Sequence, residues 1–256
     1  MIDALSIASS GLSANQAWID SISNNVANMQ TVGFKKNQVN FRDLVQHVIT
    51  DNSNTNAPSR TNGAGIQVMP SSLDLRTGTI RASNNPLDIA IQGNGFFEVA
   101  LSSGGTAYTR DGRFHVNAEG LLVSRDGRVL TSDVRIPPDA DKITIQANGQ
   151  VQVKIANTGE IMNVGQIRLA YFASAENLTR LGDGLYRQTS QSGEAIYTEA
   201  GTSGTGVLLS NHVEMANVDM IEEMTNLVLA QRAYQMNARL LQASDQILET
   251  INNLRR

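Results

Sequence analysis

The sequence has no cysteine, which excludes disulfide bonds and thiolate metal sites. Aromatic residues make up only 5% of the chain, and no platform of them for stacking a glycan can be identified. The net charge of −4 leaves no basic stripe to displace the counterions of a nucleic acid. No apolar run approaches the roughly 20 residues that span a bilayer. The N-terminus also lacks the basic and apolar regions of a cleavable signal peptide, so we expect none.

Residue patterns that carry catalysis or bind metals are also scarce. The histidines His47, His115 and His212 lie in three separate segments without neighbours at ligand spacing. The stretch 93–95 lacks the third glycine of a dinucleotide loop and precedes a strand-like segment. No pair of carboxylates is isolated in an apolar setting. We therefore expect no metal, no cofactor and no small-molecule substrate, and an enzyme is the least favoured class.

The C-terminal segment, residues 217–256, contains neither glycine nor proline and has a helical period. One series of positions alternates steps of four and three, as in the seam of a heptad helix. Asp219 and Glu222 have capping-box spacing at its start. A second apolar stripe includes Ile221 and Val228, so one partner helix would not cover this helix. The seam contains Met220, Met224, Leu227, Gln231, Tyr234, Leu241 and Leu248.

Residues 2–29 repeat the same period at the other end of the chain. The segment has no proline, and its one glycine, Gly11, is tolerable in a helix at a cost of about 1 kcal/mol. Asn15 occupies a seam position, where a polar side chain typically fixes register and partner number. Gly33 suits a left-handed C-cap. The seam residues are Leu5, Leu12, Asn15, Ile19, Ile22 and Val26.

The middle of the chain has a different period. From about residue 66 to 209, short runs alternate with a period of two and are separated by glycine-containing turns such as Asp111-Gly112. Asp-Gly between alternating runs indicates a hairpin. The runs 143–145 and 151–153 are expected to pair across Asn148-Gly149. Ahead of this region, the stretch 51–63 is polar and of low complexity, as in a flexible loop or linker.

Together these patterns predict an α+β protein. We expect N- and C-terminal heptad helices packed together as a coiled coil, with an inserted all-β domain of short antiparallel strands. The predicted division has an N-terminal helix at 1–33 and an extended linker or stiffening segment at 34–65. A β-rich domain at 66–209 follows, and a C-terminal helix at 210–256 packs with 1–33.

Four stretches resemble the signatures of flagellar axial proteins, the family of rod, hook and hook-associated proteins. They are the Asn-rich segment 23–35, the central segments 86–97 and 108–114, and the segment 214–219 followed by 231–237. Four motifs in this order, extending over almost the whole chain, are highly specific. The motif residues are Asn24, Asn25, Asn28, Gly33, Phe34, Gly93, Gly95, Phe96, Asp111, Gly112 and Asn217.

The resemblance implies a structural subunit that self-assembles into a rigid hollow helical tube, transmits torque and continues the export channel. The length and the polar stretch 46–65 are most similar to distal-rod subunits, with a proximal-rod or hook-type subunit as the alternative. The implied partners are further copies of the chain, proximal-rod and hook subunits, the surrounding P- and L-ring proteins and the flagellar export apparatus. The implied location is the basal body, where the rod spans the periplasm.

The seam residues of both helices are therefore our candidate assembly interface. A helix with several apolar faces suits contacts with its own N-terminal helix and with neighbouring copies, which repeat without closing in a filament. An alternative from another class is a β-domain binding module carried on a self-contained helical stalk. Protection of both chain ends from amide exchange in the dilute monomer would favour the stalk.

Overall fold

The computed structural model describes residues 2–47, 61–102, 104–132, 134–156, 159–202 and 204–254. Residues 51–60, most of the polar stretch singled out in the sequence, lie outside this set. The chain forms two compact units. The first unit comprises Met1–Ala27, Asn37–Ser72 and Asp219–Arg256, and the second comprises Asn28–Lys36 and Leu73–Val218.

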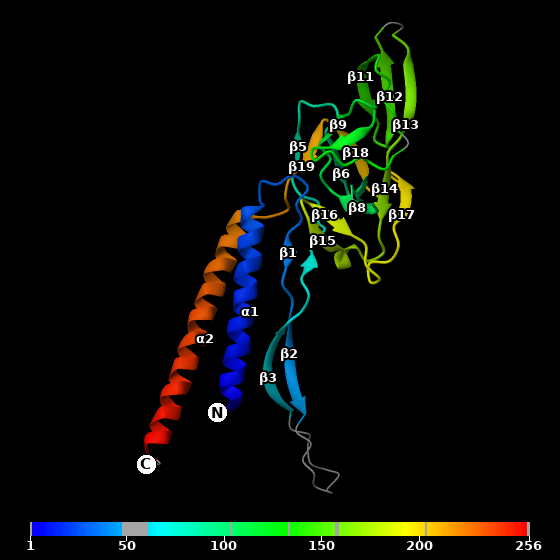
Figure 1. The fold of residues 1–256 in the computed structure, drawn as a ribbon. Helices are drawn as coiled ribbons and strands as arrows, with labels where there is room; N and C mark the ends of the chain where they lie inside the picture. The colour runs from blue at the N-terminus through cyan, green and yellow to red at the C-terminus, as the bar shows by residue number, and fades with distance from the viewer. Residues whose placement is uncertain are drawn as a thin grey trace. The chain divides into compact units, whose positions relative to one another are not determined.

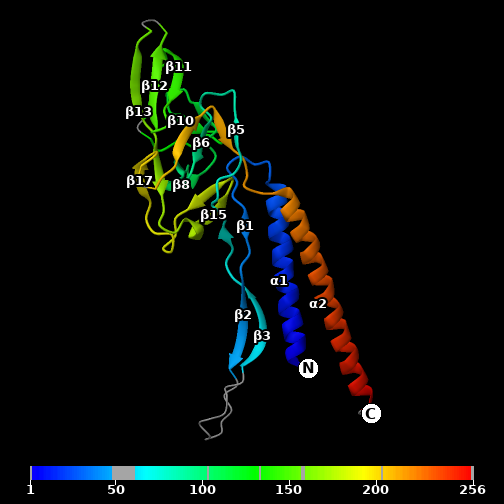
Figure 2. The same ribbon diagram turned by 180° about the vertical axis from the view of Figure 1, so that it is seen from behind.

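The first unit contains both predicted terminal helices, α1 (Ile2–Ala27) and α2 (Met220–Leu254). They lie side by side and antiparallel, so that the two chain ends lie at the same end of the pair (Figures 1 and 2). Asp219 caps α2, because its Oδ1 accepts hydrogen bonds from the backbone N–H groups of Ile221 at 2.8 Å and Glu222 at 3.3 Å. In the described ranges, neither helix is long and apolar enough to cross a membrane.

The side of α2 that contacts α1 includes small and polar residues that are not members of the predicted seam. Glu223 and Ala230 are buried, and Glu223 Oε2 accepts a hydrogen bond from Asn25 Nδ2 of α1 at 3.4 Å. Asn237 lies so close to Gly11 of α1 that a Cβ at Gly11 would be 2.7 Å from its Nδ2. These α2 residues precede the seam positions by one residue. Small side chains at this contact let the helix backbones approach closely, which leaves the larger side chains on other faces.

The first unit also contains a hairpin of two strands, β2 (Phe41–His47) and β3 (Thr61–Val68). The strands are antiparallel, with Phe41 opposite Val68, and the hairpin runs along α1 (Figures 1 and 2). Ile66 N donates to Ser10 Oγ of α1 at 3.2 Å. The Trp18 and Phe41 rings meet edge to face with centroids 6.2 Å apart. Residues 41–47 and 61–65 of the expected 34–65 linker are therefore paired strand, and β1 (Asn37–Gln38) lies in the same segment. The short strand β4 (Ser72–Leu73) follows it.

The second unit is built from short strands, and all of its described pairings are antiparallel. Its strands are β5 (Ile80–Ala82), β6 (Ile89–Gln92), β7 (Phe97–Ala100), β8 (Thr106–Thr109), β9 (Phe114–Val116), β10 (Leu122–Ser124), β11 (Ala140–Ile145), β12 (Gln150–Ile155), β13 (Ile161–Gln166), β14 (Arg168–Tyr171), β15 (Thr179–Gly182), β16 (Leu185–Arg187), β17 (Ile196–Glu199), β18 (Val207–Ser210) and β19 (His212–Glu214), with the 3₁₀ turn η1 at Ala175–Asn177. The larger sheets have the orders β15-β16-β8-β7 and β11-β12-β13.

Two turn predictions have different outcomes. The pairing across Asn148-Gly149 is confirmed, because Ile143 lies opposite Val153 in the β11–β12 hairpin. The hairpin predicted at Asp111-Gly112 is wrong: β8 pairs with β7 and β16, whereas β9 pairs with β10. Gly112 instead crosses β6, where its carbonyl accepts a hydrogen bond from Ile89 N at 2.9 Å. Gly is required there because a Cβ would collide with the Ile89 carbonyl oxygen.

Two hydrophobic clusters form the core of the second unit. The larger includes Ile89, Phe97, Val151 and Leu169, each with no exposed surface. The smaller is aromatic: the Tyr108 and Phe172 rings pack edge to face with centroids 4.8 Å apart. Burial on this scale holds the loops between the strands at fixed positions, including those that carry the motif residues.

Candidate functional site

Three buried ionic side chains from distant parts of the sequence meet in the second unit. Lys35 Nζ lies 2.6 Å from Glu214 Oε1, and Arg110 Nη1 lies 3.2 Å from Glu214 Oε2. Each of the three side chains keeps 1% of its surface exposed. Lys35 belongs to the segment after α1, Arg110 follows β8, and Glu214 ends β19. We call Lys35, Arg110 and Glu214 the charge anchor.

Backbone groups also form hydrogen bonds with the charged side chains of the anchor. Lys35 Nζ also donates to the Arg76 carbonyl at 2.8 Å, and Gly78 N donates to Glu214 Oε1 at 3.0 Å. Arg110 Nη2 donates to the Gly93 carbonyl at 2.7 Å. Removing charges from water costs several kcal/mol per ion, and these ion pairs and hydrogen bonds offset that cost. The anchor therefore fixes the geometry of these segments tightly.

The anchor holds two cations against one carboxylate, and this imbalance affects Lys35. Burial lowers the pKa of Lys35, and the positive charge of Arg110 lowers it further, while Glu214 opposes both effects. The resulting pKa is about 8, against 10.5 for an ordinary lysine. Burial likewise lowers the pKa of Arg110, with Glu214 again opposing the shift.

Gly33 brings the segment before Lys35 against the loop after β8. Its φ of +71° lies in the left-handed region, and a Cβ there would be 2.5 Å from Asp111 N. Gly33 N donates to the Glu214 carbonyl at 2.7 Å. Phe34 is buried beneath the Arg180 guanidinium, whose carbon lies 4.8 Å from the ring centroid. Gly33 does not cap α1, which already ends at Ala27, and its left-handed conformation serves this long-range contact instead.

Asn217 joins the points where the chain enters and leaves the second unit. Its Oδ1 accepts a hydrogen bond from Lys36 N at 2.7 Å, and its Nδ2 donates to the carbonyls of Asp74 at 2.8 Å and Arg76 at 3.1 Å. Asp74 N also donates to the Lys36 carbonyl at 3.0 Å. One amide side chain therefore fixes three backbone segments to one another.

The first unit presents an apolar helical face. Ten large apolar side chains of α2 are at least 38% exposed: Met220, Ile221, Met224, Val228, Leu229, Tyr234, Met236, Leu240, Ile247 and Leu248. At about 100° per residue these side chains point to several sides of the helix, and we call them together the exposed α2 face. Single exposed apolar residues are ordinary, but a continuous series along one helix marks an interaction surface.

Comparison with known families places the motifs in context. The model described as "Flagella basal body rod protein" matches residues 5–35. The model "Flagellar hook protein FlgE/F/G D1 domain" matches residues 90–153, and "Flagellar basal body rod FlgEFG protein C-terminal" matches residues 209–254.

Full-length relatives decide the assignment. The flagellar basal-body rod protein FlgG of Caulobacter vibrioides is 39% identical, over 99% of this chain and 100% of the relative. FlgG of Bacillus subtilis is 37% identical over the whole of both chains. The chain belongs to the flagellar basal-body rod protein family. A hook-basal body complex protein of B. subtilis, FlhP, is also similar, at 29% identity over both whole chains.

The charge anchor of this rod-family protein draws one residue from each region that the family models match. Lys35 lies in the first region, Arg110 in the second and Glu214 in the third. The sequence motifs contained all three residues, but neither spacing nor period distinguished them. Residue type did not single them out either, because the same motifs also contain the charged residues Asp111, Arg113 and Asp219.

The structure places the predicted motif residues mainly inside. Buried members are Asn25, Gly33, Phe34, Gly95, Phe96 and Gly112; half-buried members are Asn28, Gly93, Asp111 and Asn217; Asn24 is exposed. Asn25 binds the chain that follows α1, because its Nδ2 donates to the Asn37 carbonyl and its Oδ1 accepts from Asn37 N, both at 2.9 Å. The motif residues therefore organise the rod subunit internally.

The predicted assembly residues occupy all three exposure classes. Ile22 is buried; Leu5, Leu12, Asn15, Ile19, Val26, Leu227 and Leu241 are half-buried; Met220, Met224, Gln231, Tyr234 and Leu248 are exposed. Their role between subunits stays a prediction. No group of three or more His, Asp or Glu side chains in the described part of this rod-family chain is arranged to hold a metal ion.

Proposed function

We propose that the chain is a distal-rod subunit that self-assembles into a rigid, hollow helical tube. The observation that carries this proposal is the exposed α2 face, which a single α1 helix leaves uncovered. Ile221 is 79% exposed, Met236 65% and Leu240 59%. Burying apolar surface yields about 25 cal/mol per Å², so covering such a face with neighbouring copies is strongly favourable.

Within such a tube, α1 and α2 pair as a coiled coil and pack with the helices of neighbouring copies to form the inner wall. The predicted seam, from Leu5 to Val26 on α1 and from Met220 to Leu248 on α2, supplies that interface. Each contact is heterologous and repeats by a screw operation, so the assembly extends instead of closing. The β-rich region forms the outer wall, and the tube continues the export channel and transmits torque without catalysis.

The segment 34–65 has the proposed role of stiffening the tube. The β2–β3 hairpin supports this role, because Phe41 is 44% exposed and Val45 49% exposed on a ribbon whose described pairing is confined to its own two strands. Such surface becomes buried when an adjacent copy packs on it. A hairpin clamped between copies resists bending better than a free loop does.

The proposed partners are further copies of the chain, proximal-rod and hook subunits, the P- and L-ring proteins and the export apparatus. The full-length similarity to basal-body rod proteins supports the basal body as the location. Passage through the export apparatus without a cleaved signal peptide, followed by assembly across the periplasm, completes the proposal.

Charge on the exposed α2 face tests the proposal. The double variant Val228→Lys and Leu240→Lys places two cations on the face, and polymerisation of the purified chain is followed by light scattering and sedimentation. The control, Gln235→Lys with Gln242→Lys, alters exposed polar positions of the same helix. We expect the first variant to lose polymerisation and motility rescue while keeping the monomer's circular dichroism. Polymers of wild-type yield and length from the first variant would contradict the proposal.

A further inference from the structure

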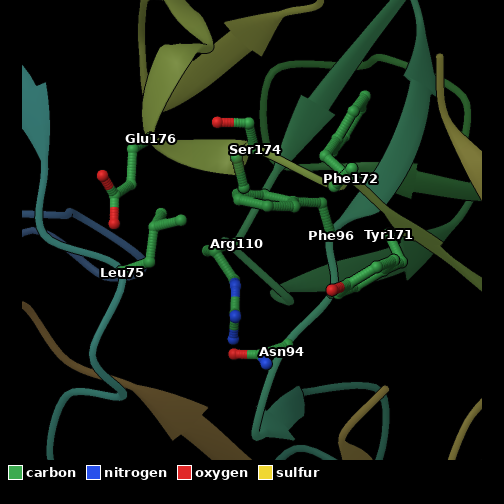
Figure 3. A pocket seen from close by; sticks show the side chains of 11 residues that line it. Leu75, Asn94, Phe96, Arg110, Tyr171, Phe172, Ser174 and Glu176 are labelled. Carbon is green, nitrogen blue, oxygen red and sulfur yellow. The ribbon is translucent and has the colours of Figure 1, made fainter. Parts of the chain in front are cut away.

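Buried polar side chains occur in both units, but they join different parts of the chain. In the second unit, Arg110 lies among the side chains that line a pocket of about 340 Å³ (Figure 3). Its Nη1 donates to Glu214 and its Nη2 to the Gly93 carbonyl, so both groups are already used within the fold. In the first unit, a buried polar pair joins the two helices themselves.

Two contacts define the register in which α1 and α2 meet. Near the end of α1, Asn25 Nδ2 donates to Glu223 Oε2 at 3.4 Å, and both residues are 1% exposed. Further along, Gly11 lies against Asn237, whose Nδ2 would be 2.7 Å from a Cβ at residue 11. The two residues of α1 are 14 positions apart, and so are the two residues of α2. Both contacts therefore belong to one antiparallel register and are two heptads apart.

The level midway between these contacts combines a large residue with a small one. Ala230, seven positions after Glu223, has no exposed surface. The matching position of α1 is Trp18, seven positions before Asn25. Large residues opposite small ones let two helices interdigitate in one arrangement. Sliding α2 by one heptad in either direction would bring Trp18 to the level of Glu223 or of Asn237, so these layers would no longer match.

The chain that follows α1 holds the Asn25 amide in one orientation. Asn25 Oδ1 accepts a hydrogen bond from Asn37 N, and Asn25 Nδ2 donates to the Asn37 carbonyl, both at 2.9 Å. An amide nitrogen carries two hydrogens, so the second one is left for α2, where Glu223 accepts it. An apolar side chain at position 223 would leave this buried N–H without its acceptor, which is costly. Asn25 therefore specifies the chemistry of the α2 residue that it meets.

Apolar burial alone does not account for the side of α2 that meets α1. The ten residues of the exposed α2 face would bury more apolar surface if α2 turned them toward α1. We propose that Glu223, through Asn25, selects the side and the register with which α2 packs on α1. A buried polar residue at a helix contact specifies register in this way at a cost in stability. Given the proposed function, this selection keeps the exposed α2 face accessible to neighbouring copies.

Disulfide trapping measures the helix arrangement directly, because the chain has no cysteine of its own and a disulfide forms only between closely placed residues. Gly11→Cys with Asn237→Cys reports the observed arrangement. Gly11→Cys with Ser244→Cys reports a slip of one heptad, and Gly11→Cys with Met236→Cys reports a rotation of α2 by about 100°. The full chain is oxidised while dilute and monomeric, and the linked peptides are quantified by mass spectrometry. In the wild-type background, we expect the slipped and rotated cross-links to be at least about tenfold rarer than the first.

Two substitutions at position 223 separate selection from bulk. Glu223→Gln keeps an oxygen that accepts from Asn25 Nδ2, so its cross-linking pattern should match that of the wild type. Glu223→Leu removes the acceptor, and the slipped or rotated cross-links should rise at least about tenfold, the factor that one hydrogen bond to a charged group supplies. The control, Glu249→Leu, makes the same change at an exposed position of α2 and should leave the pattern unchanged.

Three outcomes would overturn the proposal. The observed cross-link alone in Glu223→Leu would mean that other contacts set the register. Loss of every cross-link together with the helical circular dichroism would mean that Glu223 stabilises the pair without selecting its arrangement. A Glu223→Gln pattern equal to that of Glu223→Leu would mean that the accepted hydrogen bond is not what selects.

Cross-linking of the monomer does not depend on polymerisation, so this test is separate from that of the proposed function. With the slipped or rotated cross-links increased, Glu223→Leu should also polymerise less than the wild type does. Wild-type polymerisation of a Glu223→Leu chain with the shifted pattern would support the selection by Glu223 and count against the exposed α2 face as the assembly surface.

Discussion

Replacing Glu214 by Gln tests whether the charge anchor stabilises the second unit. The substitution keeps the size of the side chain and removes its charge, which leaves Lys35 and Arg110 buried without a counterion. Removing one partner of a buried ion pair typically costs about 3–5 kcal/mol, because the remaining charge stays desolvated. The amide can still accept from Gly78 N, so the loss comes from the two cations. We expect the free energy of unfolding to fall by about 3–5 kcal/mol.

Urea unfolding of the full chain measures this loss separately in the two units. Tyr108 and Tyr186 are buried in the second unit, so near-ultraviolet circular dichroism reports on it. Trp18, the single tryptophan, belongs to the first unit and gives an independent fluorescence signal. With a slope of about 2 kcal/mol per molar urea, the tyrosine transition should move down by about 2 M.

Two further variants make the reasoning refutable. Glu119→Gln removes an exposed carboxylate of the same unit and should change stability by less than about 0.5 kcal/mol. Adding Lys35→Met to Glu214→Gln removes one of the uncompensated cations, so part of the lost stability should return. A loss below about 1 kcal/mol in Glu214→Gln, or no recovery in the double variant, would show that the buried charges are not held by this carboxylate.

Three other predictions follow from the same contacts. Folding lowers the pKa of Lys35 from 10.5 to about 8, so the unfolded chain binds the lysine proton more tightly than the folded chain does. The free energy of unfolding of the wild type should therefore rise by about 3 kcal/mol between pH 8 and 10.5, relative to that of Lys35→Met. Parallel profiles of stability against pH for the two proteins would contradict this. Gly33→Ala should lower the free energy of unfolding by more than about 2 kcal/mol, because residue 33 has a left-handed conformation and the new Cβ would collide with the backbone at Asp111. The amide resonances near Asp111 should also broaden. A fall in melting temperature of less than about 2 °C would contradict this prediction. Asp219→Ala removes the cap of α2 and should lower the free energy of unfolding of the helix pair by about 1 kcal/mol. Asp219→Asn should keep most of that stability, because an amide oxygen can still accept the capping hydrogen bonds. Equal losses in the two variants would argue against capping.

Local patterns predicted the elements that depend on local physics. The period of the terminal segments gave both helices, but α1 ends at Ala27 instead of 33. α2 begins at Met220 instead of 210, because His212–Glu214 form β19. Asn148-Gly149 gave a hairpin because the turn conformation and the flanking alternation agree there. The same reasoning failed at Asp111-Gly112, where the glycine is needed for close passage over β6 instead of for a turn.

Long-range contacts explain what the sequence did not reveal. Periodicity identified the apolar stripes of α2, but it did not show which stripe meets α1, because the inward side uses Ala230 and Asn237 instead of large apolar residues. In the charge anchor, Lys35 and Arg110 are 75 positions apart in the sequence, and Arg110 and Glu214 are 104 positions apart. No local pattern encodes such a meeting, since it depends on the path of the β strands between them.

The hydrogen bonds of Asn217 have a consequence for how the length of the chain can vary. Because Lys36 and Asp74 are fixed to each other and to Asn217, the stretch between them leaves and returns at one closed junction. The entropy of closing a loop grows only with the logarithm of its length, by about 0.6 kcal/mol for each doubling. Insertions or deletions in residues 48–60 should therefore leave the junction intact. The number of residues between Lys36 and Asp74 can therefore change without altering the hydrogen bonds that close this junction.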